Sequence, residues 1–260
     1  MFSFFKSKKK KVGLFLSGGA VRGIAHIGVL RAFEFFKYPI DIIYGTSSGA
    51  IIGSLYCAGM KPEQLIAIME TLSMREFVKF KLSRQALFSS EAIQLFVEKH
   101  IGKVTFRDLK IPLGVFVTNI LTGKAELIRG LDLDVSSYVR ASSSIPGVFT
   151  PTTLESKTYI DGAFGSDQDL NTFDCDIKIA CNAISEKPLQ IIPKTIPELV
   201  DRAAECLMIS KGYYQAHYYD LQLNVIDQPM SSIDLKFRKS LVEYGFKCIE
   251  NNRKRIEAIL

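Results

Sequence analysis

The pentapeptide GTSSG at residues 45–49 lies between two apolar runs, IDIIY at 40–44 and AIIGSL at 50–55. The first run is rich in β-branched residues and predicts a strand, whereas the second predicts a helix. A strand, a G-x-S-x-G turn and a helix are the context of a nucleophile elbow, in which the serine projects from a tight turn. Ser47 is therefore a candidate nucleophile. The alternative is a glycine-rich turn whose serine only caps the helix.

The residues around Ser47 suit such a turn. Gly45 and Gly49 carry no side chain at the positions where the backbone of an elbow passes closely. The next peptide N–H, that of Ser48, lies at the predicted helix N-terminus, where partial positive charge favours an oxyanion. We therefore expect Ser48 to contribute to an oxyanion hole.

A second glycine-rich turn precedes the elbow. Residues 12–16, VGLFL, predict a strand that is buried on both faces, as in a parallel sheet. The loop SGGAVRG at 17–23 follows, and a mostly apolar helix is predicted over 24–36. The free N–H groups of such a loop are able to bind an anion. Because the loop matches neither the dinucleotide fingerprint nor the Walker motif with its lysine, we expect an anion site and no nucleotide site.

A serine nucleophile needs a base. Asp161 ends a strand predicted at 157–160, and its low-charge surroundings favour a raised pKa. A triad of Ser47, Asp161 and His217 is the alternative in α/β-hydrolase order, but His217 falls at a predicted helix end and the elbow follows only the second strand. His26, on the helix after the glycine-rich loop, is either a catalytic base or a packed helix histidine.

Strands and helices alternate along the chain. Further strands are predicted at 113–119, 124–128, 177–181 and 221–226, the first two as a hairpin. This order predicts a layered α/β fold with a mostly parallel, mixed sheet. We expect residues 12–260 to form a single domain after a basic tail at 1–11. A capping box predicts a helix from residue 196. On one face that helix carries Ile196, Leu199, Val200, Ala203 and Leu207.

Two segments have less specific patterns. Residues 74–88 interleave aromatic and basic side chains, which indicates either an interfacial segment or a surface strand and loop. The serines of a predicted loop at 141–147, after a helix predicted over 135–140, lack an elbow context and are interpreted as turn formers.

The composition limits the class of protein. The 260 residues carry a net charge of +6, and the five cysteines form no C-x-x-C motif. We therefore expect free thiols in a reducing compartment and no metal site. The tail at residues 2–11 combines phenylalanines with lysines, and it either contacts anionic lipid peripherally or is solvated. The sequence predicts no nucleic-acid binding and a cytoplasmic location, with peripheral contact at the inner face of the membrane.

The motifs at residues 16–30, 45–50, 144–151 and 161–163 together resemble the patatin-like phospholipase family, in the order and spacing of its small bacterial members. The resemblance implies a three-layer α/β/α fold, a Ser-Asp dyad and no metal or cofactor. It also implies a lipid substrate, from which an acyl hydrolase releases fatty acids: a phospholipid, a lysophospholipid or a related ester. In the dyad, Ser47 is the nucleophile and Asp161 the base. The resemblance assigns the oxyanion loop to Gly18, Gly19, Ala20 and Arg22.

The chain departs from the family pattern at two places. The family usually has glycine at the position of Ala20, and an alanine with positive φ there carries strain of about 1 kcal/mol. Residues 165–170, GSDQDL, stand where the family commonly has an Asn and a Pro. The alternative function is therefore a non-catalytic or weakly active lipid-binding module with the same fold.

Overall fold

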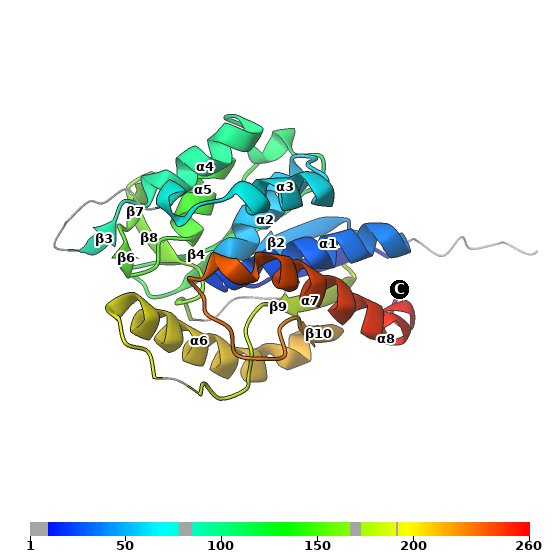
Figure 1. Cartoon of the computed structure of the whole chain (residues 1–260). Coiled ribbons are helices and arrows are strands. Elements are labelled where there is room, and N and C mark those ends of the chain that lie inside the picture. Colours follow the sequence, from blue (N-terminus) through cyan, green and yellow to red (C-terminus); the bar gives the residue numbers. More distant parts are fainter. Residues whose placement is uncertain (1–9, 78–84, 167–172, 191) are drawn as a thin grey trace, which may run out of the picture.

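The structure, a computed structural model, describes residues 10–77, 85–166, 173–190 and 192–260. Within these residues an eight-stranded sheet forms the centre of the molecule (Figure 1). It consists of β1 (Val12–Leu16), β2 (Ile42–Gly45), β4 (Leu113–Asn119), β5 (Ala125–Ile128), β7 (Thr152–Leu154), β8 (Lys157–Asp161), β9 (Ile177–Asn182) and β10 (Leu221–Asn224). A separate small sheet pairs β3 (Ala86–Phe88) with β6 (Gly147–Phe149).

The large sheet is mixed and mostly parallel, as predicted. Its order is β10-β9-β1-β2-β4-β8-β7, and β5 also pairs with β4. The strands from β10 to β4 are parallel neighbours, whereas β5, β7 and β8 pair in antiparallel fashion. Leu16 at the end of β1 is in register with Gly45 of β2 and Cys181 of β9. The loops that follow β1 and β2 therefore start side by side at one edge of the sheet.

Helices cover both faces of the sheet and complete three α/β/α layers (Figure 1). One side carries α1 (Ala25–Phe36), α2 (Ser48–Cys57), α3 (Pro62–Thr71), α4 (Glu91–Ile101), α5 (Val135–Ser142), α7 (Arg238–Asn251) and α8 (Arg253–Glu257). The other side carries α6 (Ile196–Gln215). Since successive strand residues face opposite sides, Leu14 and Leu16 pack under the first group. Phe15 points to the other side and stacks on Tyr44, with ring centroids 4.7 Å apart.

The long helix α6 presents several of its apolar side chains to solvent. A surface helix usually buries its apolar stripe, but Ile196 is 68% exposed and Leu199 is 61% exposed. Ala203 and Cys206 continue this outer stripe and are also exposed. Glu205 is buried instead. The polar side of α6 therefore faces the loops that leave the sheet.

One predicted helix is longer in the structure, and one predicted segment is only partly described. α5 extends two residues past its predicted end and includes Ser142. In the segment 74–88, residues 74–76 form a 3-10 helix and 86–88 form β3, while 78–84 lie outside the described residues, as does most of the tail. In the part of the chain that is described, no helix has both the length and the apolarity needed to cross a membrane.

Candidate active site

The backbone makes a sharp turn at Ser47, between β2 and α2. Ser47 has φ 52° and ψ −123°, a sparsely populated conformation for a residue with a side chain. A Cβ atom on Gly49 would lie 2.1 Å from the carbonyl oxygen of Leu16, and one on Gly45 would lie 2.6 Å from Cα of Ala50. The turn is therefore as tight as the sequence predicted, and both glycines are required by close backbone approach.

A buried serine from α5 supports this turn. The backbone N–H of Ser47 donates to Oγ of Ser142 at 2.9 Å, and the Ser142 hydroxyl donates to the carbonyl of Phe116 at 2.6 Å. Ser142 thus connects the elbow to β4. The interpretation of this serine as a turn former was wrong, because α5 continues through it and its hydroxyl bonds residues far away in the sequence. No local pattern around Ser142 indicates this role.

The side chain of Asp161 meets that of Ser47. Asp161 ends β8, is 2% exposed, and lines the same small cavity as Ser47. Its Oδ1 also accepts a bond from the N–H of Ala163 at 2.9 Å. Burial raises the pKa of Asp161 to about 6, although the Ser47 hydroxyl, the Ala163 N–H and the nearby Lys211 cation act in the opposite direction. A carboxyl group with this pKa is able to exchange a proton near neutral pH.

The loop after β1 lies against Ser47. Gly18, Gly19 and Ala20 line a small cavity of about 20 Å³ together with Ser47 and Asp161. Ala20 has φ 51°. Position 20 therefore has the positive φ at which alanine is strained, and alanine costs about 1 kcal/mol there relative to glycine.

Arg22 is almost fully buried and supports the loop after β1. Its Nε donates to the carbonyl of Gly19 at 3.1 Å. Its two terminal nitrogens pair with Asp201, at 3.2 Å, and with Glu205, both from α6. The sequence did not predict these two acidic partners, because they follow Arg22 by 179 and 183 residues.

Ser48 takes its expected place at the start of α2. As the first residue of that helix, it has a backbone N–H without an intrahelical acceptor. Its side chain packs against Gly23, where a Cβ atom would lie 2.2 Å from the Ser48 Oγ. The elbow and the loop after β1 are therefore in direct contact.

The histidines lie apart from the pair formed by Ser47 and Asp161. His26 is fully buried, and its Nε2 lies 2.9 Å from the carbonyl oxygen of Ser17. Burial lowers the pKa of His26 to about 4, which fits a packed helix histidine. His217 is exposed in a 3-10 helix and packs on Tyr218. A triad through His217 is not assembled, because Ser47 and Asp161 are both buried.

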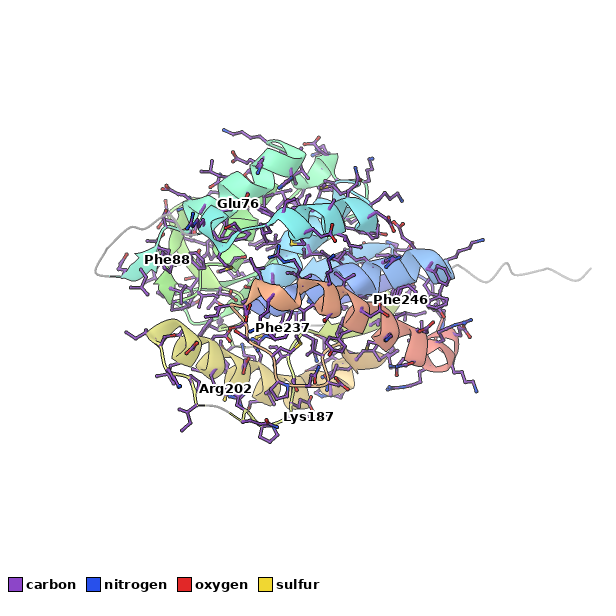
Figure 2. The ribbon with its side chains drawn as sticks, in the orientation of Figure 1. Glu76, Phe88, Lys187, Arg202, Phe237 and Phe246 are labelled. Carbon is purple, nitrogen blue, oxygen red and sulfur yellow. The ribbon has the colours of Figure 1, made fainter. Side chains whose placement is uncertain are left out.

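An apolar cavity of about 420 Å³ opens beside Ser47. The 3-10 helix η1 (Ala20–Ile24), α2, α3, α4 and the β3–β6 sheet contribute to its walls. Phe88 lines it from β3, at the end of the molecule away from Phe246 of α7 (Figure 2). Within the described residues, no group of His, Cys, Asp or Glu side chains is arranged to hold a metal ion.

The family follows from a match over the same part of the chain. Residues 14–173 match the family model described as patatin-like phospholipase. These residues include the loop after β1, the elbow and Asp161. The chain therefore belongs to the patatin-like phospholipase family, and the resemblance noted in the sequence is confirmed.

Relatives among known proteins share this region. An uncharacterized NTE family protein of Mycobacterium bovis is 31% identical over 159 residues, which are 60% of this chain and 43% of that protein. Lysophospholipase NTE1 of Pyricularia oryzae is 31% identical over 162 residues, 60% of this chain and 11% of that protein. The chain thus matches less than half the length of either relative.

Solved structures share the fold over nearly the whole chain. VipD from Legionella pneumophila is similar with a TM-score of 0.62 and 13% identity, covering 97% of this chain and 68% of VipD. ExoU, in the ExoU–SpcU complex of the Pseudomonas aeruginosa type III secretion system, is similar with a TM-score of 0.54 and 18% identity. That match covers 96% of this chain and 53% of ExoU. These neighbours support the three-layer α/β/α architecture.

Proposed function

We propose that the protein is a serine lipid acyl hydrolase with a Ser47–Asp161 dyad. One observation carries the proposal: Ser47 lies beside the buried carboxyl group of Asp161 and also lines a large apolar cavity. The carboxyl group supplies a base, and the cavity suits an acyl chain. Membership of the patatin-like phospholipase family supports the same reaction class.

The reaction follows from these positions. The Ser47 oxygen attacks the carbonyl carbon of an acyl ester while its proton passes to Asp161. Backbone N–H groups of Gly19, Ala20 and Ser48 stabilise the oxyanion. The ester C–O bond then breaks, and Asp161 returns the proton to the leaving alcohol. Water then attacks the acyl–Ser47 ester while its proton passes to Asp161. The bond between the acyl carbon and the Ser47 oxygen breaks, Asp161 returns the proton to that oxygen, and a fatty acid leaves.

We propose phospholipids, lysophospholipids and related acyl esters as substrates. The walls of the cavity are mostly apolar, so they favour a hydrocarbon chain over a polar group. The relative named lysophospholipase NTE1 supports lysophospholipids within this set.

A second candidate function is a lipid-binding module with weak or no turnover. The left-handed Ala20 favours it, because a strained alanine can displace an oxyanion-hole donor from its best position. The same cavity would then hold a lipid without hydrolysis.

Labelling by a fluorophosphonate probe and hydrolysis of a short-chain ester distinguish these functions. We expect the probe to label Ser47, and Ser47→Ala to lose both labelling and hydrolysis while remaining folded. Asp161→Asn is expected to be nearly as damaging, since the pair acts as a unit. His217→Ala serves as the matched control and keeps most of kcat. Hydrolysis by Ser47→Ala above a few per cent of wild type would refute the nucleophile.

We also propose that residues 2–11 contact anionic membranes peripherally in the cytoplasm. The segment joins Phe2, Phe4 and Phe5 to a run of lysines, and each cation near such a surface contributes about 1 kcal/mol. Deletion of residues 2–10 is expected to weaken co-sedimentation with anionic vesicles at low salt and to spare hydrolysis of a soluble ester. Equal co-sedimentation of both forms would exclude the tail as an anchor.

A further inference from the structure

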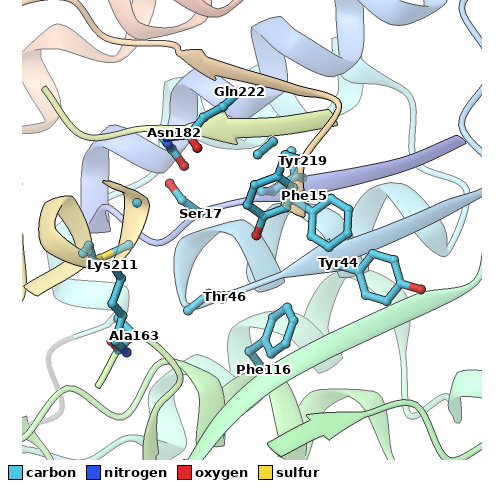
Figure 3. Close-up of a pocket in the computed structure, with 14 residues that line it drawn as sticks. Phe15, Ser17, Tyr44, Thr46, Phe116, Ala163, Asn182, Lys211, Tyr219 and Gln222 are labelled. Carbon is cyan, nitrogen blue, oxygen red and sulfur yellow. The ribbon is translucent and has the colours of Figure 1, made fainter. Parts of the chain in front are cut away.

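Lys211 extends from the inner side of α6 toward the segment that follows Asp161 (Figure 3). It lines a second cavity, of about 90 Å³, on the side of the sheet that α6 covers. Aromatic rings of Phe15, Tyr44 and Phe116 also line this cavity. The amine thus lies beside apolar walls, where its hydrogen bonds to the protein are stronger than in water.

The amine of Lys211 donates hydrogen bonds to two carbonyl groups of the loop after β8. Its Nζ donates to the carbonyl of Ala163 at 2.7 Å and also to the carbonyl of Gly165. The N–H of Ala163 in turn donates to Oδ1 of Asp161. The loop after β8 is therefore held at its carbonyls by Lys211, while one of its N–H groups holds the carboxyl group.

We propose that Lys211 is a positioning residue for Asp161, which fixes the loop that orients the carboxylate toward Ser47. This inference rests on the proposed function, because it assigns Asp161 the role of base. Three N–H donors on a flexible stem suit a side chain that must bond two carbonyl groups at once. A displacement of a catalytic group by about 1 Å can cost about 100-fold in rate, so fixing this loop has a measurable effect.

The charge of Lys211 gives the proposal a second, independent consequence. Two charged side chains of α6 act on Asp161: the Lys211 cation lowers its pKa, and the Asp201 carboxylate raises it. The Ser47 hydroxyl and the Ala163 N–H, from the elbow and the loop, also lower it. Removal of the Lys211 charge must therefore raise the pKa of Asp161, because the remaining charge and burial both favour the protonated carboxyl group.

The first test measures the Asp161 carboxyl titration by ¹³C NMR in the full-length protein, with Asp161→Asn to assign the signal. Lys211→Met removes charge and donors, Lys211→Gln removes the charge and keeps an amide donor, and Lys211→Arg keeps both. We expect the Met and Gln variants to raise the midpoint by about 0.5–1 pH unit, and Arg to restore it. Lys99→Met, which removes an exposed lysine of α4, is the control and leaves the midpoint unchanged. A wild-type midpoint in Lys211→Met would overturn the proposal.

The second test separates kcat from KM on a soluble ester. We expect Lys211→Met to lower kcat by about 10- to 100-fold near pH 6, to lower it less near pH 9, and to leave KM within about twofold. Lys211→Gln is expected to recover part of kcat at high pH, where the charge matters least. A loss of thermal stability in Lys211→Met with an unchanged pH profile would assign a merely structural role. Ser47→Ala is measured in parallel: if it retains hydrolysis, the proposed function fails, whereas the NMR titration still decides the role of Lys211.

Discussion

Two residues of the candidate active site hold left-handed backbone conformations although both carry side chains. Ser47 has φ 52° and Ala20 has φ 51°. At Ser47 the conformation is part of the elbow that projects the hydroxyl. At Ala20 the preceding peptide is held by the bond from Arg22 to the Gly19 carbonyl. Such strain is tolerated because the surrounding contacts determine the backbone.

Ala20→Gly is expected to remove the strain at the loop. We expect the free energy of unfolding to rise by about 1 kcal/mol and kcat to stay equal or increase with little change in KM, since an oxyanion donor acts in the transition state. Denaturant unfolding and steady-state kinetics measure both. Ser156→Gly, which replaces a residue with φ 67° in the turn between β7 and β8, is the control and should change stability alone. A large fall in kcat would show that alanine is required at position 20.

Asp161→Asn is expected to stabilise the fold above pH 6 while it abolishes hydrolysis. The pKa of Asp161 is about 6 in the folded chain, against an ordinary value of 3.8. The folded state therefore binds this proton more tightly, so stability falls as pH rises from about 4 to 6. At 1.36 kcal/mol per pH unit, the loss is about 3 kcal/mol at most. Asparagine has no such loss.

Urea unfolding at pH 4 and pH 8 measures this difference. The stability gain of Asp161→Asn over wild type is expected to be larger at pH 8 than at pH 4. Asp132→Asn, at a side chain that is 85% exposed, is the control and should show no such trend. Equal gains at both pH values would mean that the pKa of Asp161 is not raised by burial.

At the scale of elements, α6 joins two loops that are distant in sequence. Its acidic side chains pair with Arg22 under the loop after β1, and its lysine bonds the loop after β8. The helix can serve both loops because its polar side faces inward. In the apolar stripe predicted on α6 from the sequence, Ile196, Leu199 and Ala203 are exposed, whereas Val200 and Leu207 are half-buried. Periodicity identifies a face of a helix without saying which way that face points.

Glu205→Gln is expected to weaken the connection between α6 and the loop after β1. Glu205 accepts bonds from Arg22 and from Arg202, the latter at 2.7 Å. Loss of its charge should lower the free energy of unfolding by about 1–3 kcal/mol. We also expect a lower kcat, because Arg22 fixes the carbonyl of Gly19. Glu243→Gln, at an exposed pair on α7, should change neither quantity. Unchanged unfolding and kcat in Glu205→Gln would contradict the bracing role of this ion pair.

For the whole molecule, local patterns predicted the layers of the fold and the placement of Ser47, Asp161 and the glycine-rich loop. Each depends on a strand and the turn that follows it, within a short stretch of sequence. The roles of Ser142 and Lys211 were not predicted, because Ser142 bonds residues 26 and 95 positions away and Lys211 bonds residues 46 and 48 positions away. Hydroxyl and amine groups carry no local signature of such contacts, which appear only once the strand order brings the segments together.

The exposed stripe of α6 also gives the protein a native chemical handle. Cys206 is exposed on that stripe, whereas burial raises the pKa values of the other four thiols, Cys57, Cys175, Cys181 and Cys248. Because the thiolate is the reactive form, a maleimide at neutral pH should attach rapidly to Cys206 alone, and to all five cysteines only after denaturation. A dye introduced in this way, without any substitution, would report by its fluorescence on motions of the helix that braces both loops.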